Sequence, residues 1–417
     1  MNIFIFLSLL MISCNSNIDF QLKEKEEVQE TTEEQNDGTS KSQLIISNNM
    51  DASLVLGQID FTSSSQNIDG TTPKANSLKT VQGIYSDFAN DRLAIADRGN
   101  NRILIFTNFP STNGESATIA LGQPDLITNT ENNGGRSATS LSAPKDVVWN
   151  GAELFVSDTG NNRTLVWTSF PTNFAEAADY VVGQPDMVTG TASTGGRSAS
   201  TIKSYYAHSA FATENYLYTA EHGSNRLLIH PLPITSDFAA ATYVIGPSDF
   251  VTYGSSTASD TSLDLPVGVW SNDQYIIIAD RYNHRVVIHN NFPSTATGAV
   301  HDVVIGQVDF TGQSANQGGS VGANTLNEPH SVFYDGERLF IADTSNHRVL
   351  VFNSIPTANN ASADYVIGQP DFTSNTSNQG GVVGANTLSA PSNLTYDSDC
   401  GCLLVGDKSN SRVLIYK

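Results

Sequence analysis

The segment ADRGNNRILIF (residues 96–106) is the first of six similar segments in this 417-residue chain. The other copies are SDTGNNRTLVW (157–167), AEHGSNRLLIH (220–230), ADRYNHRVVIH (279–289), ADTSNHRVLVF (342–352) and GDKSNSRVLIY (406–416). Every copy keeps an acidic residue and, five residues later, an arginine, and the arginines recur at a period of about 62 residues. A fixed period of this length indicates a ring or array of repeated structural units.

A second motif lies between these segments and repeats at the same period. Its copies are LGQIDF (56–61), LGQPDL (121–126), VGQPDM (182–187), IGPSDF (245–250), IGQVDF (305–310) and IGQPDF (368–373). Two independent series of six at one period predict six copies of one supersecondary unit.

Residues 141–187 show what one unit contains. Four short apolar or alternating runs are bounded by turn residues: DVVW after Pro144, ELFVSD, RTLVW and DYVVGQPD. Such runs predict a blade of four antiparallel strands, here called a, b, c and d. Only 15% of residues are charged, and Gly, Ser, Thr and Asn are abundant, as in turn-rich β proteins. We therefore predict an all-β fold, a six-bladed β-propeller.

The ends of the repeated region indicate how the ring closes. LVLGQIDF (54–61) is a d-type strand with no a, b or c strand before it, and RVLIYK (412–417) is a c-type strand with nothing after it. We expect the N-terminal strand to join the last blade, because this pairing removes an exposed sheet edge. The propeller is predicted to span residues 51–417.

The D-x-x-[NS]-x-R segments resemble NHL repeats, and the resemblance extends over roughly residues 52–417. It implies a six-bladed propeller and no particular activity.

The N-terminus is predicted to be a targeting segment. Residues 1–13, MNIFIFLSLLMIS, are apolar and too short to span a bilayer, and Cys14 follows directly. They resemble a bacterial lipoprotein signal, which implies that Cys14 is lipidated; a plain secretory signal and a retained buried strand are the alternatives. Residues 15–50 hold eight acidic residues and three lysines, so residues 14–50 are predicted to be a disordered acidic tether. We expect a lipoprotein of the cell envelope that faces the periplasm or the cell surface.

The formal net charge of −21 disfavours nucleic acid as a partner, although a local basic patch could still bind it.

We expect a monomer, held to a membrane by its lipid anchor, that binds a protein, peptide or glycan. Long loops on a rigid ring are common binding surfaces. The d–a crossovers between blades are long and rich in Ser, Thr, Asn and Gly, at 62–77, 127–140, 188–201, 251–262, 311–325 and 373–387.

Equivalent positions near the start of each strand a point to the mouth of the central channel. They hold Gln82, Lys145, His208, Val267, His330 and Ser392. Gln82, Lys145, His208 and His330 are the candidate ligand-binding residues; channel packing is the alternative.

A metal-dependent lyase or hydrolase that uses His208, His330 and Lys145 is the competing function. NHL-like amidating lyases hold a metal through channel histidines, which is what the resemblance implies for His208 and His330. With no third histidine in register, we expect neither a metal nor a cofactor.

The repeated acids and arginines are predicted to be structural. Because strands b, c and d are neighbours, the arginine should lie between the strand-b acid and the motif aspartate and bond to both; a calcium site is the alternative. The expected groupings are Asp97–Arg102–Asp125, Asp158–Arg163–Asp186, Glu221–Arg226–Asp249, Asp280–Arg285–Asp309, Asp343–Arg348–Asp371 and Asp407–Arg412–Asp60.

Four further residues are also predicted to be structural. His284 and His347 occupy turn positions where other blades carry Asn or Ser. Cys400 and Cys402 should lie on one face of a strand, too far apart for an unstrained disulfide, so buried thiols are favoured over a redox pair.

Overall fold

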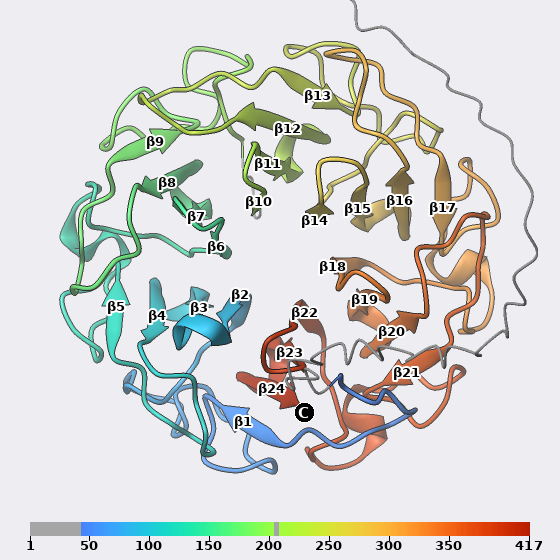
Figure 1. Cartoon of the computed structure of the whole chain (residues 1–417), viewed down its shortest axis with the longest axis horizontal. Coiled ribbons are helices and arrows are strands. Elements are labelled where there is room, and N and C mark those ends of the chain that lie inside the picture. Colours follow the sequence, from blue (N-terminus) through green and yellow to red (C-terminus); the bar gives the residue numbers. More distant parts are fainter. Residues whose placement is uncertain (1–42, 204–207) are drawn as a thin grey trace, which may run out of the picture. The chain divides into compact units, whose positions relative to one another are not determined.

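A computed structural model describes residues 43–203 and 208–417, and it contains six four-stranded antiparallel sheets around a central channel (Figure 1). The predicted all-β, six-bladed propeller is confirmed. Strand a of each blade lies innermost and strand d lies at the rim (Figure 1). No helix in the described ranges has the length and apolar character needed to cross a membrane.

The first three blades are continuous in sequence. Their strands, from channel to rim, are β2 (Val81–Asp87), β3 (Arg92–Asp97), β4 (Arg102–Phe106) and β5 (Ile119–Leu121); β6 (Asp146–Trp149), β7 (Leu154–Asp158), β8 (Arg163–Trp167) and β9 (Tyr180–Val182); and β10 (His208–Ala212), β11 (Tyr216–Glu221), β12 (Arg226–Pro231) and β13 (Tyr243–Ile245).

The sixth blade takes its outer strand from the N-terminus. The remaining strands are β14 (Gly268–Ser271), β15 (Ile276–Asp280), β16 (Arg285–His289) and β17 (Val303–Ile305); β18 (Pro329–Tyr334), β19 (Leu339–Asp343), β20 (Arg348–Phe352) and β21 (Tyr365–Ile367); and β22 (Pro391–Asp397), β23 (Cys402–Asp407), β24 (Arg412–Tyr416) and β1 (Leu54–Leu56).

Ring closure follows the prediction. β1 pairs antiparallel with β24, with Val55 opposite Leu414, and the two strands lie side by side at the junction between the ends of the chain (Figure 1). Both residues are fully buried. The last blade therefore has a paired outer edge.

The outer strands are shorter than the sequence predicted. β9 ends at Val182 rather than at Asp186 because Gly183 follows with φ +93°. A Cβ at Gly183 would also lie 2.6 Å from the side chain of Ile202, so only glycine fits this reversal. The GQPD motif is thus a tight bend beyond the strand.

The chain before β1 also packs on the ring. Leu44 and Ile46 are buried, and the Asn48 side-chain oxygen accepts a hydrogen bond from the main-chain N–H of Val366, at 3.0 Å. The Asn49 N–H donates to the Val366 oxygen at 2.9 Å. Residues 43–50, expected to belong to the tether, are therefore part of the propeller. The signal segment 1–13, Cys14 and the tether up to residue 42 lie outside the described residues.

This segment has a counterpart within the ring. Asn359 and Asn360, in the c–d loop of blade five, make the same pair of bonds to Val304 of β17, at 3.0 and 2.9 Å. Residues 43–53 thus serve as the c–d loop of blade six and attach that blade to its neighbour. We call them the N-terminal latch.

Each repeated arginine joins several strands and a crossover. Arg102 Nε donates to Asp97 at 2.7 Å, Nη1 donates to the Leu126 oxygen at 2.5 Å, and Nη2 donates to the oxygens of Lys74 and Ser77, both at 3.0 Å. The same pattern of bonds recurs in all six blades, and the arginine and the strand-b acid are fully buried in each. Each buried pair thus joins strands b and c to the crossover of its own blade.

The second carboxylate of each expected grouping does not bond to the arginine. Asp125 instead accepts hydrogen bonds from the N–H groups of Ile127 and Thr128, at 2.8 and 2.7 Å. The motif acid lies in the bend beyond strand d, where it caps the turn, and a main-chain oxygen takes its expected place on the arginine. This correction applies to Asp60, Asp125, Asp186, Asp249, Asp309 and Asp371.

Candidate ligand-binding site

The predicted site residues lie at the ends of the inner strands that adjoin the crossover loops. Gln82 is in β2, Lys145 precedes β6, and His330 is in β18; their exposed fractions are 5%, 5% and 7%. His208 begins β10, where its backbone pairs with Glu221. The side chain of His208 lies outside the described part of the structure.

Several buried polar atoms at this end of the channel have no hydrogen-bond partner among the described residues. They are Oε1 of Gln82, Nδ1 of His330 and both ring nitrogens of His222. By contrast, Lys145 Nζ donates to the Ser209 hydroxyl at 3.1 Å. Unpaired buried atoms also occur elsewhere in the described blades, as at both ring nitrogens of His230. Most buried polar groups have a partner, so the four atoms beside the channel favour a site that water or a ligand completes.

A second set of side chains at this end was not predicted from the sequence. A short 3₁₀ turn follows strand b in every blade: η2 (Arg98–Asn100), η4 (Thr159–Asn161), η5 (His222–Ser224), η6 (Arg281–Asn283), η8 (Thr344–Asn346) and η10 (Lys408–Asn410). Its first residue differs from blade to blade. We call these first residues the turn ring: Arg98, Thr159, His222, Arg281, Thr344 and Lys408.

The turn ring borders the channel strands. The Thr344 hydroxyl donates to the Pro391 oxygen at the start of β22, in the next blade, at 2.5 Å. Arg281 Nη2 likewise donates to Glu328 Oε2 at 2.5 Å, and Glu328 directly precedes β18 of the next blade. The turn η2 contacts β2, and η10 contacts β22. The turn ring therefore surrounds the polar end of the channel.

The ring carries positive charge that the described part of the chain does not neutralise. Arg281 pairs with Glu328. Within residues 43–203 and 208–417, Arg98 and Lys408 have no carboxylate at ion-pair distance. Both are only partly exposed, and burial lowers the pKa of each.

Charges from several blades act on the buried groups. Burial is the largest cause of the lowered pKa of Lys145, which is about 7; Asp146 opposes it, and Arg281 and Arg98 add to it. Burial also lowers the pKa of His330 well below its usual range, and Lys145 adds to that shift. The charges of these groups therefore act on one another at this end of the channel.

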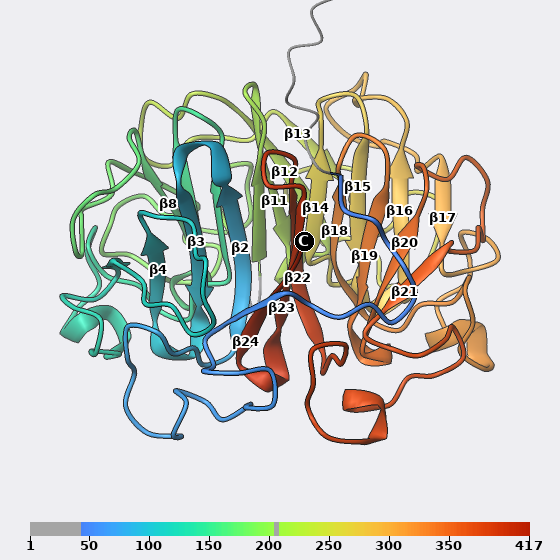
Figure 2. The ribbon, with the colours of Figure 1, turned by 60° about the horizontal axis from the view of Figure 1, so that its bottom comes forward.

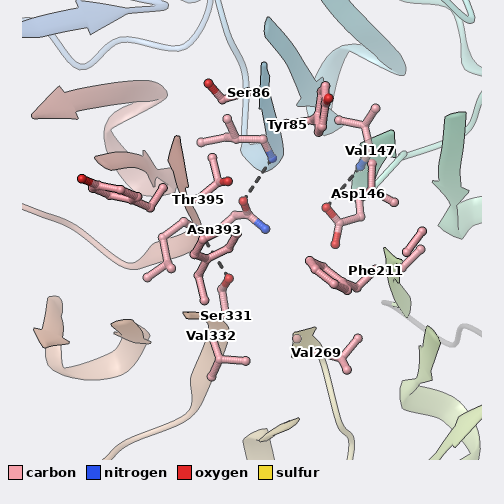
Figure 3. A pocket seen from close by; sticks show the side chains of 18 of the residues that line it. Tyr85, Ser86, Asp146, Val147, Phe211, Val269, Ser331, Val332, Asn393 and Thr395 are labelled. Atoms are coloured by element: carbon pink, nitrogen blue, oxygen red, sulfur yellow. Dashed lines mark hydrogen bonds between the residues drawn. The ribbon is translucent and has the colours of Figure 1, made fainter. Parts of the chain in front are cut away.

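A cavity of about 220 Å³ lies next to this polar end, between the inner strands of all six blades (Figure 3). Figure 3 shows Asp146, Phe211, Ser331 and Asn393 around it. Asp146 and Ser331 directly follow Lys145 and His330, so the cavity begins where the predicted site ends and extends toward the a–b turns. Burial raises the pKa of Asp146 to about 6, and Lys145 opposes this shift. Aromatic faces beside a few polar groups suit a small ligand or one unit of a larger one.

The long loops gather on the face that carries the turn ring. Figure 2 shows the crossover loops at the lower edge of the view and the a–b hairpin turns, such as that between β2 and β3, at the upper edge. In β2, Val81 pairs with Asp97, which directly precedes η2, whereas Asp87 pairs with Arg92 at the other end. We call the first end the long-loop face.

His284 and His347 occupy turn positions, as predicted, with φ +50° and +56°. Nδ1 of His284 accepts the Glu328 N–H at 3.0 Å, and Nδ1 of His347 accepts the Ala390 N–H at 2.9 Å.

The prediction for the two cysteines was wrong. Cys400 and Cys402 form a disulfide, with their Cα atoms 5.3 Å apart. Only Cys402 belongs to β23, whereas Cys400 lies in the preceding turn and Gly401 has φ +59°, so strand alternation does not separate the two side chains.

In the described ranges, no group of three His, Cys, Asp or Glu residues is arranged to hold a metal ion. His330 and Lys145, which the competing enzyme hypothesis requires, are buried in the channel wall.

The comparisons with known proteins agree with the fold. Residues 326–352 match the NHL repeat. This match spans β18, β19 and β20 of the fifth blade. None of the curated proteins matches the sequence.

Two solved structures are similar to the chain at low identity. An auxiliary nutrient binding protein from Bacteroides thetaiotaomicron VPI-5482 is 12% identical, with a TM-score of 0.50, over 87% of this chain and 75% of that one. A streptogramin B lyase is 11% identical, with a TM-score of 0.42, over 82% of this chain and 93% of that one. At 12% identity, the likeness to the nutrient binding protein concerns the fold and not the function.

Proposed function

We propose that this propeller is a binding module, tethered to a membrane of the cell envelope through Cys14, that recognises a protein, peptide or glycan on the long-loop face. The predicted lipid anchor would hold the ring at the membrane, facing either the periplasm or the cell surface. The ligand would reach into the channel at Gln82, Lys145, His208 and His330.

One observation supports this proposal: the amino-acid sequence of the repeat varies from blade to blade at the position that borders the channel opening. Residues that the fold requires repeat in all six blades, as the arginine and the strand-b acid do. The turn ring instead holds Arg, Thr, His, Arg, Thr and Lys in order. If these residues only packed, equivalent positions in the six blades would be expected to carry equivalent residues. The turn ring instead carries different polar side chains, and the ring nitrogens of His222 are unpaired within the described ranges, which favours a role in recognition.

The experiment uses the full-length protein, purified in detergent, on glycan and peptide arrays and with envelope extract. The key variant is Lys145→Met, which keeps the side-chain length and removes the charge. Its control is Lys74→Met, at a lysine of the 62–77 crossover that pairs with Asp69. We expect a ligand whose affinity falls about tenfold in the Lys145 variant, as for a lost hydrogen bond to a charged group. Equal binding by both variants, or no ligand at all, would contradict the proposal.

A further inference from the structure

The turn ring at the channel mouth holds two cations without an ion-pair partner among the described residues. Arg281 is neutralised by Glu328, and the charge of Asp146 acts on Lys145. Arg98 and Lys408 remain without a carboxylate partner among the described residues. A cationic mouth is unexpected in a protein of formal net charge −21 and therefore requires an explanation.

Hydrogen-bond donors accompany these charges. His222 is 3% exposed, and neither ring nitrogen has a partner in the described part of the chain. His330 is similarly buried, with Nδ1 unpaired. A neutral imidazole carries one N–H, so each ring can donate one hydrogen bond to a bound group.

We propose that this mouth is a binding site for a dianionic oxyanion of the phosphate or sulfate class, held by Arg98 and Lys408 with Lys145, His222 and His330 as further donors. The inference rests on the proposed binding role and specifies the chemical class of the ligand that the site binds. The oxyanion would be a free ion or an ester group on the larger ligand.

Charge balance favours a dianion over other ligands. A single carboxylate would leave one of the two cations unmatched, whereas a phosphate monoester carries a charge of about −1.5 to −2 at neutral pH. The candidate side chains are donors, and charge-assisted N–H···O⁻ bonds are the strong ones. A metal cation would be repelled by Arg98 and Lys408.

Dianion binding should be coupled to proton uptake. An added negative charge raises the pKa of a nearby lysine, and Lys145 starts from a lowered pKa of about 7. Because its pKa is lowered, we expect Lys145 to gain a proton when the anion binds. The charged or titratable groups that act on it or lie at the mouth with it are Asp146, Arg98, Arg281 with its partner Glu328, Lys408, His222 and His330.

Isothermal titration of the full-length protein at low salt tests the site. The probes are sulfate, inorganic phosphate, phenyl phosphate and acetate. We expect both free dianions to bind and acetate to bind at least about tenfold more weakly. Phenyl phosphate distinguishes an ester from the free ion: tighter binding than inorganic phosphate would indicate an ester group as the natural ligand, and equal or weaker binding a free ion.

The key variant in this titration is the double substitution Arg98→Gln with Lys408→Gln. Its control is Arg92→Gln with Lys417→Gln, which removes the same charge from the opposite end of the blades. We expect sulfate affinity to fall at least about tenfold in the key variant and to stay within about twofold of the unmodified protein in the control. An equal effect of both variants would show that only overall charge matters and would overturn the site.

Sulfate also reports the proton directly, because it does not titrate between about pH 6 and pH 8. Titrations in two buffers of different ionisation enthalpy should show proton uptake, and Lys145→Met should abolish it. If neither dianion binds while an array ligand still depends on Lys145, the inference fails and the proposed function stands. If sulfate binds as described and the arrays yield no ligand, the proposed function fails and the anion site stands.

Discussion

Arg412 donates its Nη1 to the main-chain oxygen of Phe61 at 2.5 Å, across 351 residues of sequence. The two residues belong to opposite ends of the propeller's amino-acid sequence. Their contact continues the β1–β24 pairing and gives the last blade the same arginine-centred network as the other five. The ring is thus closed by backbone pairing and by a buried side chain together.

The N-terminal latch should contribute to stability. Removing residues 1–42 should leave the free energy of unfolding unchanged, whereas removing residues 1–53 should lower it by about 3 kcal/mol or more, because buried Leu44 and Ile46 and the bonds from Asn48 and Asn49 are lost. Urea unfolding of both truncations measures the difference. Identical midpoints would show that the latch contributes nothing.

The arginine networks predict a contrast between the acids of one blade. Asp280→Asn should cost about 3–5 kcal/mol, because it leaves the fully buried Arg285 without its counter-charge. Asp309→Asn should cost far less, because Asp309 is exposed, does not bond to the arginine and caps a turn whose N–H an asparagine oxygen can also accept. Thermal unfolding of the two variants provides the comparison. Similar losses would restore the rejected grouping of one arginine between two carboxylates.

The fold could be predicted because its determinants are local and repeated six times. The arginines and the GQ bends fall at fixed positions, so their period defined the blades. The end of strand d could not be predicted as well, because it depends on the positive φ of Gly183 and on packing against Ile202. The latch was missed because its similarity to the Asn359–Asn360 loop is confined to a few polar residues.

Stability should fall in mild acid because buried histidines stay neutral. His289 and His301 are hydrogen-bonded at 2.8 Å, and burial lowers the pKa of His289 to about 4 and that of His301 well below its usual value. Between about pH 6.5 and pH 4 the unfolded chain binds more protons than the folded protein, so the free energy of unfolding decreases as the pH falls.

The double variant His289→Leu with His301→Leu should flatten this dependence in urea unfolding. The comparison is His284→Asn, at a half-buried turn position where other blades carry Asn. The double variant should change the slope more than His284→Asn does. An unchanged slope in the double variant would mean that other groups cause the acid sensitivity.

The candidate site could be predicted only in part. Aligning the blades on the strand-b acid identified the start of each strand a, where Gln82, Lys145 and His330 are. Arg98 and Lys408 were not identified because they stand inside the repeated segment and read as turn residues. The sequence feature that could have identified them is the first position of the 3₁₀ turn, which holds a different side chain in successive blades. The cavity was not predicted because it arises only when the six inner strands converge.

Membrane attachment is predicted to depend on Cys14, the residue that follows the apolar run 1–13. Cys14→Ser should move the protein from the membrane fraction to the soluble fraction and abolish labelling by a fatty-acid probe, since the acyl chains supply the affinity for the bilayer. Fractionation with immunoblotting tests this outcome. An unchanged membrane fraction in the variant would exclude the lipid anchor.

Crystals of the protein soaked in selenate would test whether the channel mouth on the long-loop face is the binding site. Selenate is a dianion of the proposed class, and its selenium can be located by anomalous scattering. We predict an anomalous peak at the mouth within hydrogen-bonding distance of Arg98 and Lys408, absent in crystals of the Arg98→Gln, Lys408→Gln variant. A mouth without a peak, or peaks only on other faces of the ring, would contradict the account.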